Sequence, residues 1–430
     1  MFSRPRILLM AILVSVFLPF AARADTTPLD LKFQFGSNAS AAGYTTVASD
    51  AAYADSTGYG FEPVSAAVTA ADHAATSDGA FYFSVKVPEG SYRVTVSLGN
   101  PTTETTTTVK AELRRLMLDE VHTTAGQFVT RDFNVNVRYP TFDGGKKVRL
   151  KAPRETTQEA WAWDDKLTLE FIGQHPSVST IEITSANDLP VLYIIGDSTS
   201  TDQSRETYNS WGQTITRFFN DGIVVANHGE SGETANSFIG ENRWPKVLSV
   251  IKPGDWVFMQ FGHNDEKDKG ANAGAFKNYK TALEKFVADT RAHGATPVVF
   301  TPMHRKTFDA NGKVTNSHGD YLAAARQVAS EQKVALIDLA NYSQTLYEAF
   351  GPDKVSVLFA TPKEGTHHSD FGSYEMARCI VEGIKADNLS IAKYLVTDVP
   401  AFDPAHPDNF ADFKIPADPT GAPASRPFGS

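Results

Sequence analysis

The fold of this chain is decided by the stretch Val191-Leu192-Tyr193-Ile194-Ile195-Gly196-Asp197-Ser198-Thr199-Ser200. Its first five residues are apolar and rich in β-branched types, which is typical of a strand buried on both faces. The small residues that follow predict a tight turn carrying a hydroxyl group. In an open α/β sheet, ligands gather at the carboxyl ends of the strands. Ser198 is therefore a candidate nucleophile, which would need a base and oxyanion donors from elsewhere in the chain.

The chain beyond residue 190 alternates apolar strand-like runs with helix-like runs. This alternation predicts an α/β domain in which a parallel sheet carries helices on both faces. The expected strands are 191–195, 223–226, 256–261, 297–301 and 334–337. The expected helices are 211–219, 234–251, 276–293, 321–332 and about 374–384.

Residues from about 29 to 183 instead show period-two alternation between turn signals. Short alternating strands predict an all-β antiparallel sandwich in front of the α/β domain. The expected strands are 81–87, 92–98, 133–137, 147–151, 167–171 and 181–183. Trp161 and Trp163 of this domain are candidates for stacking on a sugar, although tryptophans in a domain of this kind more often pack in the core.

The N-terminus has the pattern of a secretory signal peptide. Arg4 and Arg6 precede an apolar run over 7–20, and Ala22-Arg23-Ala24 supplies a small-residue cleavage site. We therefore expect a mature start at Asp25, a secreted or periplasmic protein, and no membrane association after cleavage. The expected domains are a signal peptide (1–24), the β-sandwich (25–186), the catalytic domain (187–398) and a proline-rich tail (399–430) that is an extended arm or disordered.

Composition excludes several classes of protein. The net charge of −10 over 430 residues disfavours nucleic acid as a partner, because nucleic-acid binding requires a basic surface. Cys379 is the single cysteine, so an intrachain disulfide is impossible. The composition does not indicate an oligomeric state.

Four segments that follow successive elements carry groups suited to acyl transfer. Besides Ser198, Gly232 stands before a predicted helix, where backbone N–H groups favour negative charge. Asn264 can donate its side-chain amide to a developing oxyanion. Glu364 stands three residues before His367, a spacing that allows a carboxylate to orient an imidazole base. Each piece alone is an ordinary turn or capping residue, but together they predict one serine-hydrolase site.

The set resembles the SGNH (GDSL-type) hydrolase superfamily, and more narrowly the rhamnogalacturonan acetylesterases of carbohydrate esterase family 12. The resemblance spans roughly 191–386. It is carried by Gly196-Asp197-Ser198-Thr199, Ser210-Trp211-Gly212-Gln213, Asn227-His228, Ser231-Gly232-Glu233-Thr234, Gln260-Phe261-Gly262-His263-Asn264-Asp265, Thr301-Pro302-Met303-His304-Arg305, Gly365-Thr366-His367-His368 and Phe371-Gly372-Ser373-Tyr374-Glu375. The segments Phe35-Gly36, Gly43-Tyr44 and Gly58-Tyr59-Gly60-Phe61 also look like the galactose-binding-like β-domain that precedes related esterases.

The resemblance implies a flavodoxin-like three-layer αβα fold and a role for each residue. Ser198 would be the nucleophile, His367 the general base and acid, and Glu364 its orienting carboxylate. The oxyanion hole would be formed by Ser198, Gly232 and Asn264. His263, Trp211 and Arg305 are candidate substrate-binding residues. Neither metal nor cofactor is implied.

The chain departs from the family pattern at two positions. The family usually has aspartate where this chain has Glu364, which is one methylene longer. It often has arginine where this chain has Glu233, which puts a preference for an anionic sugar in doubt. The implied activity is removal of acetyl groups from plant cell-wall polysaccharide, with rhamnogalacturonan (pectin) as first choice of substrate and acetylxylan or another glycan as the alternative.

Two readings from other classes remain open at this level. A metallohydrolase would use the possible ligands His263, Asp265, His367, His368 and Asp370, and its activity would not survive chelators. A non-catalytic carbohydrate-binding protein would use the sandwich, which could also bind calcium or only support the catalytic domain. Such a protein would bind polysaccharide without hydrolysing acetyl esters. Surface cations that could meet a uronate are Arg243, Lys246, Arg305 and Lys306, and Tyr208 could border the pocket.

Overall fold

The structure is a computed structural model that describes residues 29–38 and 41–417. The predicted signal peptide therefore lies outside the described residues, as does the end of the predicted tail. Within the described part of the chain, none of the helices has the length and apolar character needed to cross a bilayer.

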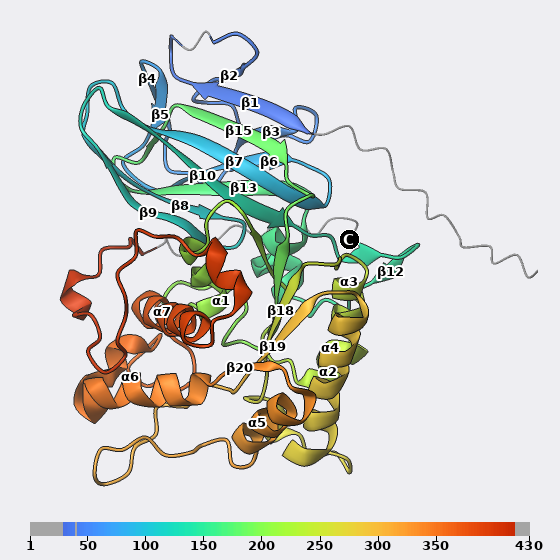
Figure 1. The fold of residues 1–430 in the computed structure, drawn as a ribbon. Helices are drawn as coiled ribbons and strands as arrows, with labels where there is room; N and C mark the ends of the chain where they lie inside the picture. The colour runs from blue at the N-terminus through green and yellow to red at the C-terminus, as the bar shows by residue number, and fades with distance from the viewer. Residues whose placement is uncertain (1–28, 39–40, 418–430) are drawn as a thin grey trace, which may run out of the picture.

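The N-terminal part is a sandwich of two five-stranded sheets (Figure 1). One sheet has the order β10-β7-β15-β1-β2, with bounds Phe128–Val137, Gly90–Gly99, Thr180–Ser185, Asp30–Phe35 and Thr45–Val47. The other has the order β3-β6-β13-β8-β9, with bounds Tyr59–Phe61, Phe81–Lys86, Lys166–Gln174, Thr105–Ala111 and Arg115–Thr123. A small third sheet joins β14 (Ser177–Val178), β5 (Ala74–Thr76) and β4 (Thr69–Ala71). Alternate apolar side chains of the two large sheets form one core, which confirms the predicted sandwich.

The predicted strand at 147–151 is wrong. Only β11 (Thr141–Phe142) and β12 (Lys146–Lys147) pair there, as a short hairpin. The alternating Val148 and Leu150 instead pack into a small separate cluster, which accounts for their spacing without a sheet. We call residues 148–163 the bridge segment; it includes a π-turn (Arg154–Gln158) and a 3-10 turn (Ala160–Trp163).

The C-terminal part is built on a parallel sheet of order β17-β16-β18-β19-β20. The strand bounds are Val224–Asn227, Val191–Gly196, Trp256–Gln260, Thr296–Phe300 and Ala335–Ile337. Numbered along the domain, this order is 2-1-3-4-5, which is the flavodoxin-like arrangement. All five predicted strands are therefore confirmed within one or two residues.

Helices cover both faces of this sheet, as Figure 1 shows. On one face lie α1 (Trp211–Thr214), α6 (Leu339–Lys354) and α7 (Asp370–Ala386). On the other lie α2 (Ala235–Gly240), α3 (Arg243–Leu248), α4 (Lys280–Ala292) and α5 (Tyr321–Gln332). Along β16, Leu192 and Ile194 face the first layer while Tyr193 and Ile195 face the second. The strand is thus buried on both sides, which explains its continuous apolar run.

The helices differ from the predicted ones in four places. The helix expected over 211–219 is α-helical only over Trp211–Thr214 and continues as a 3-10 turn. The helix expected over 276–293 begins at Lys280, because the backbone at Phe276 and Lys277 is not helical. The helix expected over 234–251 is broken, because Asn242 adopts the left-handed conformation (φ 64°) and Pro245 is tolerated only in the first turn of a new helix. Helix α6 was missing from the prediction. Its helical geometry breaks at Gly351, whose φ of 69° and ψ of 167° are not helical, and resumes at Pro352, which is tolerated in a first helical turn. Short 3-10 and π turns complete the fold at Ile215–Phe218, Asp265–Lys267, Ala275–Tyr279, Val355–Leu358, Ser390–Tyr394 and Phe410–Asp412.

Buried polar contacts join the sandwich to the α/β domain. Arg115 of β9 forms a 2.7 Å ion pair with Asp202, and both side chains are only 2% exposed. Asn134 of β10 donates to the carbonyl oxygens of Asp221 and Ile223. Leaving such a buried charge without its partner would cost several kcal/mol (about 3–5). These contacts therefore fix the sandwich against the catalytic domain.

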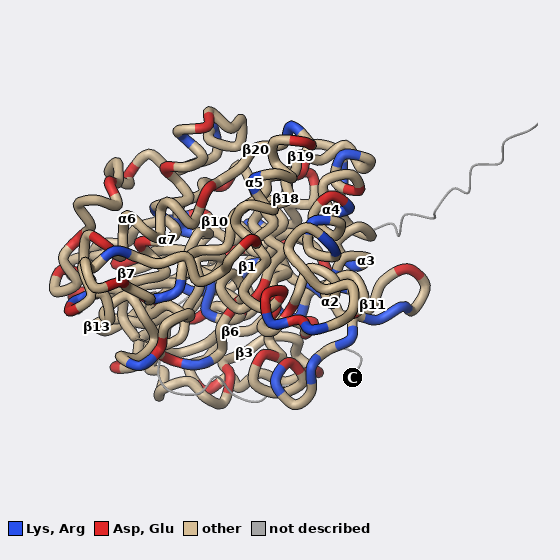
Figure 2. The backbone as a smooth tube through the Cα atoms, turned by 90° about the horizontal axis from the view of Figure 1, so that it is seen from below, with Lys and Arg blue, Asp and Glu red and all other residues tan. Residues whose placement is uncertain are grey.

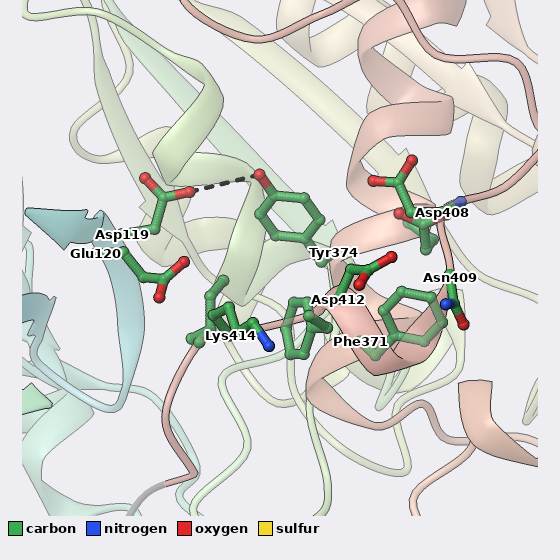
Figure 3. A pocket seen from close by; sticks show the side chains of 11 residues that line it. Asp119, Glu120, Phe371, Tyr374, Asp408, Asn409, Asp412 and Lys414 are labelled. Carbon is green, nitrogen blue, oxygen red and sulfur yellow. Dashed lines mark hydrogen bonds between the residues drawn. The ribbon is translucent and has the colours of Figure 1, made fainter.

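The predicted tail is an extended arm as far as the structure describes it. It packs Phe413 against Phe371 of α7, and Asp408 pairs with Arg378. The arm closes a cavity of about 260 Å³ against α7 and β9, whose lining includes Asp119 and Tyr374 (Figure 3). Basic and acidic residues are interspersed along the tube seen from below (Figure 2).

Candidate active site

Ser198 lies two residues beyond β16, at the carboxyl edge of the sheet. Asp197 is fully buried, and its Oδ1 accepts the N–H and the hydroxyl of Thr199, which holds the turn. At Gly196 a Cβ atom would come within 2.5 Å of the Gln260 carbonyl oxygen, so this position requires glycine. The turn thereby presents the Ser198 hydroxyl at the edge of a cavity.

His367 lies beside Ser198. Its Nε2 is 2.8 Å from Ser198 Oγ, which is hydrogen-bonding distance for removal of the serine proton. His367 precedes α7, whose first turn is capped by the side chain of Ser369. The ring centre of Tyr208 lies 5.7 Å from that of the imidazole, and Tyr208 lines the cavity, as the sequence allowed.

Glu364 lies on the Nδ1 side of the His367 imidazole, with its Oε2 3.4 Å from Nδ1. Its other oxygen, Oε1, accepts the backbone N–H groups of Gly365 and Thr366, both at 2.9 Å. Burial alone would raise the pKa of this carboxyl, but the backbone donors and His367 outweigh it, so the pKa of Glu364 is lowered. Glu364 is therefore ionised at neutral pH, as a carboxylate that stabilises an imidazolium must be.

Potential oxyanion donors face the same cavity of about 360 Å³. Asn264 donates one Nδ2 hydrogen to the Glu233 carbonyl oxygen at 3.0 Å, which leaves the second hydrogen of this NH₂ group for a ligand. Gly232 has φ +80° and lines the cavity. In the described residues, the backbone N–H groups of Ser198 and Gly232 are not used in hydrogen bonds. Three donors can thus converge on an oxygen bound beside Ser198.

The three candidate substrate-binding residues have different environments. His263 lines the cavity but is 1% exposed, and burial lowers its pKa to about 4, so its ring is neutral. Arg305 also lines the cavity, where it pairs with Glu266 and bonds Thr366. Trp211 is fully buried away from the cavity; it stacks on Phe300. The prediction for Trp211 is therefore corrected to a core role.

The remaining cations and tryptophans are also mostly structural. Arg243 pairs with buried Glu155, and Lys246 pairs with Glu89. Trp161 and Trp163 are 3% and 2% exposed, so they are not placed to stack on a sugar. Lys306 lies 5.1 Å from the ring centre of Phe359 and donates to the Pro362 carbonyl oxygen.

The ligand set considered for a metallohydrolase is dispersed. His368 bonds the hydroxyl of Tyr347 at 2.7 Å, and Asp370 lies close to Asn209. Asp265 accepts the N–H of Ala235 at the start of α2. Among the residues that the structure describes, three or more histidine, cysteine or carboxylate side chains are nowhere grouped as metal ligands.

Sequence reasoning missed the part of the cavity wall that comes from the sandwich domain. Arg154, Gln158 and Glu159 of the bridge segment line it, together with Ser198 and His367. Lys151 of the same segment pairs with Glu233, the fully buried residue that replaces the family arginine. Nothing in the local sequence signals this, because the bridge segment and the loop at 230–233 meet only in the tertiary structure.

The fold and the site geometry together define a carboxylic ester hydrolase with a serine at the edge of a parallel sheet. Residues 194–372 match the GDSL-like lipase/acylhydrolase family, and residues 31–138 match the galactose-binding-like domain of β-agarase/YXIM esterase-like proteins. The chain belongs to the GDSL-like lipase/acylhydrolase family.

The chain is similar to several known proteins. Over 220 residues (48% of this chain and 94% of the relative), it is 34% identical to rhamnogalacturonan acetylesterase RhgT of Bacillus subtilis. Over 384 residues (84% and 92%), it is 26% identical to the uncharacterized esterase YxiM of the same species. A crystal structure of the B. subtilis protein YxiM aligns with 24% identity and a TM-score of 0.47, covering 84% of this chain and 99% of that one.

Proposed function

We propose that this protein is a secreted serine carbohydrate esterase that removes acetyl groups from plant cell-wall polysaccharide, with acetylated rhamnogalacturonan as its substrate. The observation that carries the proposal is the 2.8 Å contact of Ser198 Oγ with His367 Nε2, at a cavity that Gly232 and Asn264 also line. The substrate rests on the relatives, since RhgT and YesY of B. subtilis are named as rhamnogalacturonan acetylesterase and probable rhamnogalacturonan acetylesterase.

In this mechanism His367 Nε2 takes the proton of Ser198 as its oxygen attacks the acetyl carbonyl carbon. The carbonyl oxygen becomes an oxyanion held by the N–H groups of Ser198 and Gly232 and by the Asn264 amide; removal of one such donor typically costs about 3 kcal/mol of barrier. His367 then protonates the departing sugar oxygen. Water, activated by the same imidazole, hydrolyses the acetyl-enzyme. Glu364 orients and stabilises the imidazolium.

Secretion rests on the predicted signal peptide with cleavage before Asp25. We also propose that residues 25–186 form a sandwich domain and residues 187–398 the hydrolase domain, with a tail beyond. Both tryptophans of the sandwich domain are buried, so neither offers a surface on which a sugar could stack.

The proposal is tested by measuring acetate release from a panel of acetylated polymers: rhamnogalacturonan, homogalacturonan and xylan. We expect the highest kcat/KM on rhamnogalacturonan and loss of all acetate release in the Ser198→Ala variant. A preference for acetylated xylan would overturn the assignment of rhamnogalacturonan as substrate but would leave the proposed esterase activity in place. Polysaccharide binding without acetate release by the unmodified protein would overturn the catalytic proposal itself.

A further inference from the structure

The Ser231–Gly232 peptide group is held by two cations that belong to the sandwich domain. Lys151 Nζ donates to the Ser231 carbonyl oxygen at 2.8 Å, and Arg154 Nη2 donates to the same oxygen at 2.9 Å. Both residues lie in the bridge segment, some 80 positions before the loop that they contact. In the described part of the chain, the hydrogen-bond donors to this oxygen are these two.

The carbonyl oxygen of Ser231 and the N–H of Gly232 belong to one planar trans peptide unit, so they point in opposite directions. Whatever fixes the carbonyl therefore also fixes the direction of the N–H on the cavity side. This restraint matters because Gly232, at φ +80°, has no side chain to limit its backbone. Both donors are also positively charged, and hydrogen bonds to a carbonyl oxygen polarise the amide and strengthen its N–H as a donor.

The two cations are themselves anchored. Lys151 pairs with the fully buried Glu233, and Arg243 Nε lies 3.2 Å from the same carboxylate. Arg154 pairs with the buried Glu230 and lies 3.3 Å from Glu159. Glu230 and Glu233 therefore lie on either side of Gly232 in the loop, and their carboxylates hold the two cations at the carbonyl oxygen of Ser231. The acidic Glu233, which departs from the family pattern, has a structural use here.

We propose that Lys151 and Arg154 are positioning residues for the oxyanion hole, so that the N-terminal sandwich domain completes the catalytic centre of the hydrolase domain. The inference rests on the proposed function, because it presumes that Gly232 N–H binds the oxyanion. Neither cation needs to touch the substrate; both act through the 231–232 peptide.

The test uses the full chain with p-nitrophenyl acetate, whose small leaving group makes few contacts beyond the acetyl site. Active sites are titrated, so that kcat refers to folded enzyme only. We expect Lys151→Met and Arg154→Met each to lower kcat about tenfold with KM within twofold, less than the ~10²-fold or greater loss typical of deleting a donor. The conservative variants Lys151→Arg and Arg154→Lys should recover most of kcat. Arg149→Met is the matched control, since Arg149 lies in the same segment with a side chain that is 78% exposed.

A second readout reports on the oxyanion directly. A trifluoromethyl ketone accepts the Ser198 oxygen at its carbonyl carbon while His367 takes the proton, and the former carbonyl oxygen becomes the oxyanion. Its inhibition constant should rise in each variant by the same factor as kcat/KM falls, which a general loss of stability would not produce. The Lys151→Met change is also made together with Glu233→Gln, which removes the buried charge that would otherwise keep only Arg243 as its cationic partner. A loss of kcat in this double variant supports the inference.

Three results would overturn parts of this scheme separately. Unchanged kcat and unchanged ketone inhibition in both methionine variants would refute the positioning role. If the Ser198→Ala variant is inactive in the same experiment, the proposed function still stands. A raised KM on acetylated oligosaccharide with normal p-nitrophenyl acetate kinetics would assign the cations to sugar binding and refute the inference. Activity retained by Ser198→Ala would refute the proposed function itself.

Discussion

Ser198 Oγ and His367 Nε2 lie 2.8 Å apart, although 169 positions separate the two residues in the chain. Such a pair works as one unit, so removing either partner should abolish the same step. We expect Ser198→Ala and His367→Ala each to lower kcat on p-nitrophenyl acetate by about 10⁵-fold, and the double variant to be no slower. Far-ultraviolet circular dichroism checks that the variants remain folded. Losses that multiply in the double variant would mean that the two side chains act independently.

Glu364 divides its carboxylate between two tasks, and the variants can separate them. Oε1 accepts backbone N–H groups of the 364–367 turn, and Oε2 lies 3.4 Å from His367 Nδ1. We expect Glu364→Gln, whose amide oxygen can keep the turn bonds, to lower kcat about 10²-fold through loss of the charge that stabilises the imidazolium. Glu364→Ala should lower both kcat and the unfolding temperature. Unchanged turnover in Glu364→Ala would remove this residue from the catalytic set.

In the proposed mechanism, Asn264 offers its second Nδ2 hydrogen to an oxygen that carries charge only in the transition state. We expect Asn264→Ala to lower kcat about 10²-fold while KM stays within twofold, because the ground-state carbonyl gains little from this donor. Steady-state kinetics on p-nitrophenyl acetate measures both parameters. Asn311→Ala, in an exposed turn, is the matched control. A change in KM alone would assign Asn264 to substrate binding.

Trp211 contributes to stability and not to substrate contact. It is fully buried, stacks on Phe300 and donates its Nε1 hydrogen to Gln260. We expect Trp211→Phe to lower the free energy of unfolding by about 1–3 kcal/mol through the lost bond and packing, with KM on acetylated oligosaccharide unchanged. Chemical denaturation and steady-state kinetics measure the two quantities. A raised KM at normal stability would restore Trp211 to the binding site.

Asp164 makes stability depend on pH. Burial raises its pKa to about 8, above the value of an exposed aspartate, and its Oδ2 has no hydrogen-bond partner among the described residues. Between about pH 4 and pH 8 the folded state therefore holds a proton that the unfolded state has lost. The stability contributed by this proton is full at low pH and is lost as pH rises through this window.

We expect Asp164→Asn, which mimics the neutral carboxyl, to flatten the decline in unfolding free energy between about pH 4 and pH 8. Urea denaturation at several pH values measures the unfolding free energy and its slope against pH. The exposed Asp188→Asn is the control and should leave the slope as it is in the unmodified protein. An unaltered slope in Asp164→Asn would show that other groups cause the decline.

The sequence by itself determined which stretches of the α/β domain form strands and that polar residues follow them. The apolar runs that become β16 to β19 are buried on both faces, so their hydrophobicity shows in the local sequence without ambiguity. The residues after them were foreseen as one site because the carboxyl ends of parallel strands share one edge. Helix α6 escaped prediction although Leu339, Leu346 and Tyr347 form its buried face. Its helical geometry breaks at Gly351, as the Gly-Pro pair in the sequence indicates.

Only the tertiary structure decided what surrounds Ser198. The bridge segment alternates like a strand, yet Val148 packs in a local cluster while Lys151 and Arg154 reach the loop at Ser231. Trp211 and Asn264 both lie in sequence motifs of the family, yet one is enclosed in the core and the other faces the cavity. Local pattern reports which residues avoid water, but which distant segment covers them depends on packing between domains, and that is not encoded in any short stretch of chain.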